Sequence, residues 1–105
     1  MRPQDLPLTT KLIQLAEETA ELNQACLKLL RVFRAETPVS MADAKMHLLE
    51  EIADVLLCCD IITSSSDDQI IKGIMLAKEK RWEERLAEHS TDIEATLKMM
   101  EEAHD

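Results

Sequence analysis

Apolar and small side chains recur at steps of three and four in the first third of the chain, which is the spacing of one buried stripe on a helix. The stripe consists of Leu12, Leu15, Thr19, Leu22, Cys26, Leu29 and Phe33. Thr9 or Thr10 can cap this helix, and the polar segment 34–40, which contains a proline, ends it. A second helix begins near Ser40, and its centre, residues 48–62, is apolar on nearly every side.

The second half of the chain carries two helix-start signals. After a polar run of serines and aspartates, Ser66 followed by Gln69 forms a capping-box pattern. It predicts a third helix that ends near His89. Thr91 with Glu94 repeats the pattern and predicts a short C-terminal helix.

The composition favours helices throughout, since one Gly and three Pro occur among 105 residues and aromatic side chains make up 2%. We expect an all-α domain over residues 1–105, with a core over about residues 8–88, three main helices and a short C-terminal helix. A helix that is apolar all round must be covered on all sides, and so short a chain buries only part of its apolar surface. We therefore expect a homo-oligomer, dimer or tetramer, in which helices of different copies complete a four-helix-bundle-like core.

The charge and the cysteines narrow the class of protein. A net charge of −9 repels phosphate backbones, so binding to nucleic acid is not expected. No run of apolar residues is long enough for a membrane span, so no membrane association is expected. The three cysteines are odd in number and lack zinc-ligand spacing, which favours a reducing cytoplasm.

Each of the first two predicted helices carries two carboxylates three positions apart, Glu18 with Glu21 and Glu51 with Asp54. On a helix, each pair lies on one flank of the apolar stripe, so two packed helices bring four carboxylates face to face. Clustered carboxylates repel one another unless a cation is present, and hard oxygen ligands favour Mg²⁺, or Mn²⁺, over zinc or copper. Asp54 lies among apolar neighbours, where burial without a partner is costly. The alternative is an ordinary solvated acidic face.

The ordered pair Glu18-x-x-Glu21 and Glu51-x-x-Asp54 resembles the MazG-like nucleotide pyrophosphohydrolases of the all-α NTP pyrophosphatase superfamily. The resemblance covers about residues 8–88. It implies Mg²⁺-dependent hydrolysis of an NTP or dNTP to the nucleoside monophosphate and pyrophosphate, with a house-cleaning role against non-canonical nucleotides. It also implies that the four carboxylates ligate the metal and that Glu18 or Glu21 helps to hold the attacking water.

Basic and aromatic residues supply candidates for substrate binding. Lys78, Arg81 and Trp82 share one stripe of the predicted third helix, where they can hold phosphates and stack a base. Lys28 and Arg31 on the first helix are further phosphate candidates. The alternative places Trp82 in the core and pairs the basic residues of the third helix with Glu79, Glu83 and Glu84. The third helix lacks an Asn that many members of the family carry, which leaves the choice of substrate open.

Two other functions are compatible with parts of this sequence. A non-catalytic helical assembly module would carry the same acidic flank without using it. A carboxylate-bridged di-iron bundle needs Glu-x-x-His from two helices, but only Glu101 with His104 fits. The histidines His47, His89 and His104 have no evident partners in the sequence.

Overall fold

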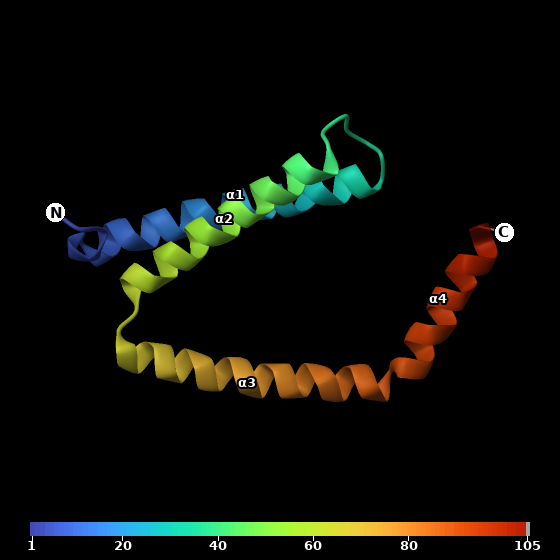
Figure 1. Ribbon diagram of the computed structural model, residues 1–105. Coiled ribbons are helices and arrows are strands. Elements are labelled where there is room, and N and C mark those ends of the chain that lie inside the picture. Colours follow the sequence, from blue (N-terminus) through green and yellow to red (C-terminus); the bar gives the residue numbers. More distant parts are fainter. Residues whose placement is uncertain (105) are drawn as a thin grey trace. The chain divides into compact units, whose positions relative to one another are not determined.

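The computed structural model describes residues 1–104, and of Thr91 and His104 it describes the backbone alone. The fold is all-α, as predicted, and no strand occurs in residues 1–104. A 3₁₀ turn and four helices follow one another: η1 (Pro3–Asp5), α1 (Leu8–Phe33), α2 (Met41–Ile62), α3 (Ser65–Glu88) and α4 (Ser90–His104) (Figure 1). They form two compact units, Met1–Ser64 and the remainder from Ser65, which are described separately below.

The first unit is a pair of antiparallel helices, α1 and α2, packed along their length (Figure 1). The amides of Ala35 and Glu36 donate to the carbonyls of Val32 and Arg31 at 3.0 and 2.9 Å. Ala35 has a φ of 56°, so α1 ends in a Schellman motif with alanine at the left-handed position that usually holds glycine. This motif turns the chain into the loop 34–40 that joins the two helices.

The starts of these helices differ in how they are capped. The hydroxyl of Ser40 accepts a hydrogen bond from the Asp43 amide at 3.1 Å, which confirms the predicted start of α2. The prediction that Thr9 or Thr10 caps α1 is wrong, because α1 begins at Leu8 directly after Pro7 and has no side-chain cap. Pro7 is the N-cap residue, with φ −59° and ψ 147°, and its ring offers no acceptor for the amides of the first turn.

The second unit consists of α3 and α4, which make few contacts with each other. The predicted end of α3 near His89 is confirmed. Its start is earlier than predicted, since Ser66 lies inside the first turn rather than before it. In the same way α4 begins at Ser90, one residue before Thr91, whose side chain lies outside the described part.

Few residues are fully buried in the chain taken alone: Ala25, Ala44, Cys58 and Glu51. The predicted stripe of α1 is half-buried at Leu15, Leu22 and Leu29. It is exposed at Leu12, Cys26 and Phe33, where the prediction of burial is wrong for a single copy. The reason is that one partner helix covers only a narrow side of α1, and that side is centred on Ala25.

Large apolar side chains on the rest of α2 remain exposed, among them Met46, Leu49, Ile52, Leu56 and Leu57. None of the helices in residues 1–104 combines the length and the hydropathy of a membrane-spanning segment.

Candidate metal centre

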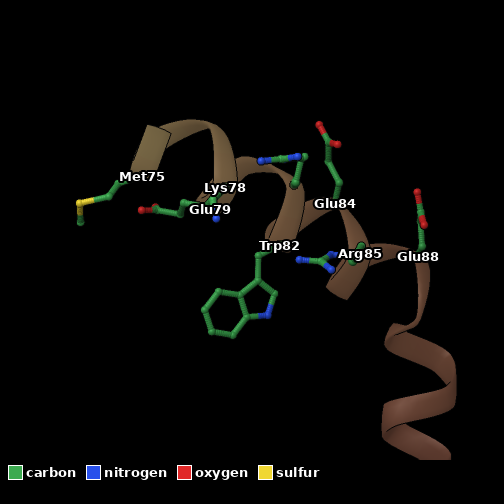
Figure 2. A pocket seen from close by; sticks show the side chains of 8 residues that line it. Met75, Lys78, Glu79, Trp82, Glu84, Arg85 and Glu88 are labelled. Atoms are coloured by element: carbon green, nitrogen blue, oxygen red, sulfur yellow. The ribbon is translucent and has the colours of Figure 1, made fainter. Parts of the chain in front are cut away.

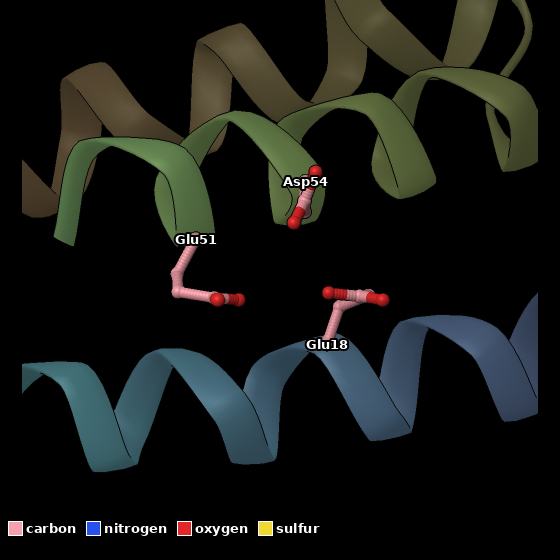
Figure 3. Close-up of side chains that lie close together, drawn as sticks. All are labelled: Glu18, Glu51 and Asp54. Atoms are coloured by element: carbon pink, nitrogen blue, oxygen red, sulfur yellow. The ribbon is translucent and has the colours of Figure 1, made fainter. Parts of the chain in front are cut away.

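Three carboxylates meet between α1 and α2. Glu18 extends from α1 toward α2, and Glu51 and Asp54 extend from successive turns of α2 (Figure 3). Each offers one oxygen atom, and these oxygens all lie within 4.8 Å of one another. The spacing of three positions in α2 and the antiparallel packing of α1 bring these groups to one place.

The three carboxylates differ in their exposure to solvent. Glu51 is only 8% exposed, Glu18 is half-buried and Asp54 is exposed. Asp54 thus avoids the cost of burial despite its apolar neighbours in sequence, because α1 covers the preceding turn of α2 and buries Glu51 instead. The fourth predicted residue, Glu21, is exposed and lies outside this group of three.

The hydrogen bonding of the cluster is incomplete. The side-chain amide of Gln14 donates to Oε1 of Glu18 at 3.0 Å. Oε2 of Glu18 and Oε2 of Glu51 are both buried and have no hydrogen-bond partner in the described part of the chain. A buried carboxylate oxygen without a partner is costly, and a bound cation removes that cost.

Two histidines have acidic neighbours, contrary to expectation. Nε2 of His47 lies 3.9 Å from Oε1 of Glu51, one turn further along α2. Nδ1 of His89 lies 3.7 Å from Oδ2 of Asp92. The expectation that these two histidines lack partners is wrong, since each lies near an acidic residue three or four positions further along the chain. The side chain of His104 lies outside the described residues.

The carboxylates of the cluster lie close enough to one another for their negative charges to repel. Burial, together with the charges of Glu21 and Asp54, raises the pKa of Glu18, and the hydrogen bond from Gln14 only partly opposes this. Burial and the charges of Glu18 and Asp54 also raise the pKa of the Cys58 thiol. A divalent cation would reverse this local potential, and carboxylate oxygens are the ligands that Mg²⁺ and Mn²⁺ prefer.

A second polar feature lies beside the cluster on the same helix pair. Five side chains line a cavity of about 370 Å³: Gln24, Lys28, Arg31, Thr37 and His47. Lys28 and Arg31 were phosphate candidates from the sequence, whereas Gln24, Thr37 and His47 were not. Thr37 belongs to the loop 34–40, and helical periodicity carries no signal for where such a loop returns.

The basic candidates of the second unit lie on the pocket-lining face of α3. Lys78, Arg81 and Trp82 line this pocket together with Met75, Glu79, Glu84, Arg85 and Glu88, and Figure 2 shows the Glu84 and Glu88 side chains pointing away from the Trp82 ring. Trp82 is 62% exposed, so its predicted alternative role in the core is wrong for a single copy. Within the described residues, no ion pair within 4.0 Å joins the basic residues of this face to its glutamates.

Comparison of the chain with protein-family models, curated proteins and solved structures finds no match. The class of this protein therefore rests on its fold and its carboxylate cluster, without support from a known relative. The protein is an all-α chain with three clustered carboxylates between two antiparallel helices.

Proposed function

We propose that this protein is a Mg²⁺-dependent nucleoside triphosphate pyrophosphohydrolase that converts an NTP or dNTP to the monophosphate and pyrophosphate. One observation carries the proposal: Glu18, Glu51 and Asp54 place oxygens within 4.8 Å of one another, and Oε2 of the buried Glu51 has no hydrogen-bond partner in the described chain. A buried carboxylate with an unpartnered oxygen, set in an acidic cluster, has the properties of a divalent-metal ligand. The sequence resemblance supplies the reaction.

The carboxylates of the centre have two proposed roles, metal binding and activation of water. Glu18, Glu51 and Asp54 are the groups that would hold Mg²⁺, and Mg²⁺ when bound offsets the negative charge that builds on phosphate oxygens. Glu21 raises the pKa of Glu18, so these two carboxylates are near neighbours at the edge of the cluster. We assign them to holding the attacking water and accepting its proton, because they adjoin the place where the metal would be held. The water oxygen bonds to phosphorus, the α–β anhydride bond breaks and pyrophosphate leaves.

The substrate needs positive charge and a stacking surface as well as the metal. Lys28 lies on the same helix pair as the carboxylates. Lys78, Arg81 and the exposed ring of Trp82 line one pocket on α3. We assign Lys28 to phosphates on the helix pair of the metal centre, and we keep Lys78 and Arg81 as phosphate candidates and Trp82 as a base-stacking candidate on α3 by itself.

Self-association is part of the proposal. Leu49, Ile52 and Leu56 follow one another on a single face of α2 and are 46%, 37% and 63% exposed. An apolar face of this kind on a soluble protein marks an interaction site. We propose that a second copy covers this face, giving a dimer or tetramer in the cytoplasm.

Pyrophosphate release from a panel of NTPs and dNTPs, with and without Mg²⁺, tests the proposed reaction. We expect activity that requires Mg²⁺ and falls by about a hundredfold or more in Glu51→Gln and in Asp54→Asn, since each removes a charged ligand. Glu50→Gln changes an exposed neighbour on the same helix and is the matched control. Activity that survives both ligand substitutions contradicts the proposal.

The second candidate function is a non-catalytic helical assembly module. The extent of exposed apolar surface on α1 to α4 favours it. It predicts that the protein assembles but releases no pyrophosphate from any nucleotide of the panel. It also predicts that Mg²⁺ does not change the thermal stability.

A further inference from the structure

The cavity at the C-terminal end of α1 is built only from basic and neutral polar groups. Lys28, Arg31 and His47 supply nitrogen donors, Thr37 a hydroxyl and Gln24 an amide. The chain contains 21 Asp and Glu residues, yet none of them lines this cavity. The net charge of the protein is −9, so a cavity lined by basic residues and by no acidic residue departs from the charge of the chain as a whole.

The donors of this cavity are largely unused. Lys28 is half-buried and forms no hydrogen bond or ion pair with any residue that the structure describes. Arg31 uses only Nε, which donates to the Leu27 carbonyl at 3.3 Å within α1. The terminal nitrogens of its guanidinium remain available for a forked interaction with an anion. Two cationic side chains that face one cavity repel each other, and an anion between them reverses that repulsion.

The cavity adjoins the carboxylate cluster. Glu18 and Lys28 are ten residues apart on α1, which is about 15 Å along the helix axis. On α2, His47 lines the cavity and also lies 3.9 Å from Glu51. A ligand that contacts both groups is therefore expected to carry more than one phosphate.

We propose that this cavity binds the distal phosphate of the substrate, through Lys28, Arg31 and the Thr37 hydroxyl, and so selects nucleoside triphosphates over monophosphates. The proposal rests on the function proposed above, because it takes the cluster as the place where the α–β anhydride lies. It assigns a role to Arg31 and Thr37, which the acidic cluster does not use. It also explains why positive charge gathers at this end of α1.

The binding test uses the full chain, labelled with ¹⁵N, and inorganic pyrophosphate as the probe in the presence of EDTA. Without a divalent cation the carboxylate cluster repels pyrophosphate, so binding reports on the cavity alone. We expect saturable shifts of the Lys28, Arg31 and Thr37 amides. Lys28→Gln and Arg31→Gln, which keep most of the side-chain stem, should each weaken binding by about tenfold or more, as expected for a charge-assisted hydrogen bond.

Lys45→Gln is the matched control, because Lys45 is exposed on α2 and does not line the cavity. It should leave the affinity for pyrophosphate unchanged. An absence of saturable shifts, or equal affinity in wild type and both cavity variants, overturns the proposal.

Kinetics with nucleoside triphosphates separate this proposal from the proposed function. Lys28→Gln should raise KM by about tenfold with a smaller change in kcat, since the distal phosphate is held in both the ground state and the transition state. If wild type hydrolyses triphosphates and neither cavity variant changes KM, the assignment of the cavity to the distal phosphate is wrong, while the proposed pyrophosphohydrolase function is retained. If wild type hydrolyses nothing, the proposed function is wrong and the assignment to a substrate phosphate is wrong with it.

Discussion

Nε2 of His47 lies 3.9 Å from Oε1 of Glu51, the most buried of the three clustered carboxylates. The same histidine lines the basic cavity that contains Lys28 and Arg31. The acidic cluster and the basic cavity are therefore neighbours on one helix pair. Opposite charges set side by side match a ligand that is itself a metal-bound polyphosphate.

The first prediction concerns the unequal positions of Glu18 and Glu21. Glu18 belongs to the group of oxygens within 4.8 Å and Glu21 does not. We expect Glu18→Gln to weaken Mg²⁺ binding by more than about a hundredfold and Glu21→Gln by at most about tenfold, the range for a group outside the ligand set. Calorimetric titration of both variants with Mg²⁺ measures this. Equal losses would mean that all four carboxylates are ligands.

The second prediction concerns the pH dependence of stability in the metal-free protein. Burial and the neighbouring charges of Glu21 and Asp54 raise the pKa of Glu18 above its ordinary value. At low pH Glu18 is protonated in both the folded and the unfolded state. Under these conditions the protein has the full stability that the protonated form of Glu18 allows. As the pH rises through the raised pKa, the unfolded state has already lost this proton, and the free energy of unfolding falls.

Urea unfolding in EDTA across a pH series measures this effect. In Glu18→Gln the fall in stability with rising pH should be smaller than in wild type. Glu17→Gln, which changes an exposed neighbour, should keep the wild-type profile. Identical profiles for wild type and Glu18→Gln would show that Glu18 does not carry the effect.

The third prediction concerns the end of α1. Ala35 adopts a φ of 56°, in the left-handed region where a side chain costs about 1–2 kcal/mol. Ala35→Gly removes that strain but adds conformational freedom to the unfolded chain, so we expect a net gain of about 0.5–1 kcal/mol. Ala42→Gly, within the first turn of α2, should destabilise instead. Chemical unfolding of both variants decides the sign, and a loss of stability in Ala35→Gly would contradict the motif.

The fourth prediction concerns the apolar face of α2. Light scattering coupled to gel filtration should show a dimer or tetramer for wild type. Leu56→Glu combined with Leu49→Glu should shift the protein toward monomer, because a charge in an apolar interface is costly. Lys45→Glu on the same helix is the control for added negative charge. A wild-type monomer at micromolar concentration would contradict the expected assembly.

Much of the fold follows from periodicity and from polar breaks. The serine cap at Ser40 and the proline-containing loop locate the two long helices, since both act on the local backbone. Periodicity alone does not fix which side of a helix its neighbour covers. For that reason the buried acid proved to be Glu51 and not Asp54.

The candidate site was likewise predictable only where it depends on spacing within one helix, and not where it depends on contacts between distant segments. Spacing placed Glu51 and Asp54 on one flank of a helix, and antiparallel packing then added Glu18. The cavity at Lys28 depends on the path of the loop 34–40 and on the approach of His47 from α2. Contacts between segments far apart in sequence have no signature in the pattern of either segment, so this cavity was not predictable.

The central claim is that Glu18, Glu51 and Asp54 hold one divalent cation jointly. Calorimetric titration of Mg²⁺ into wild type, Glu51→Gln and Glu50→Gln tests it most directly, because Glu50 and Glu51 are adjacent and differ in burial. We expect saturable binding in wild type and in Glu50→Gln and none in Glu51→Gln. Binding of equal strength in all three proteins would contradict it.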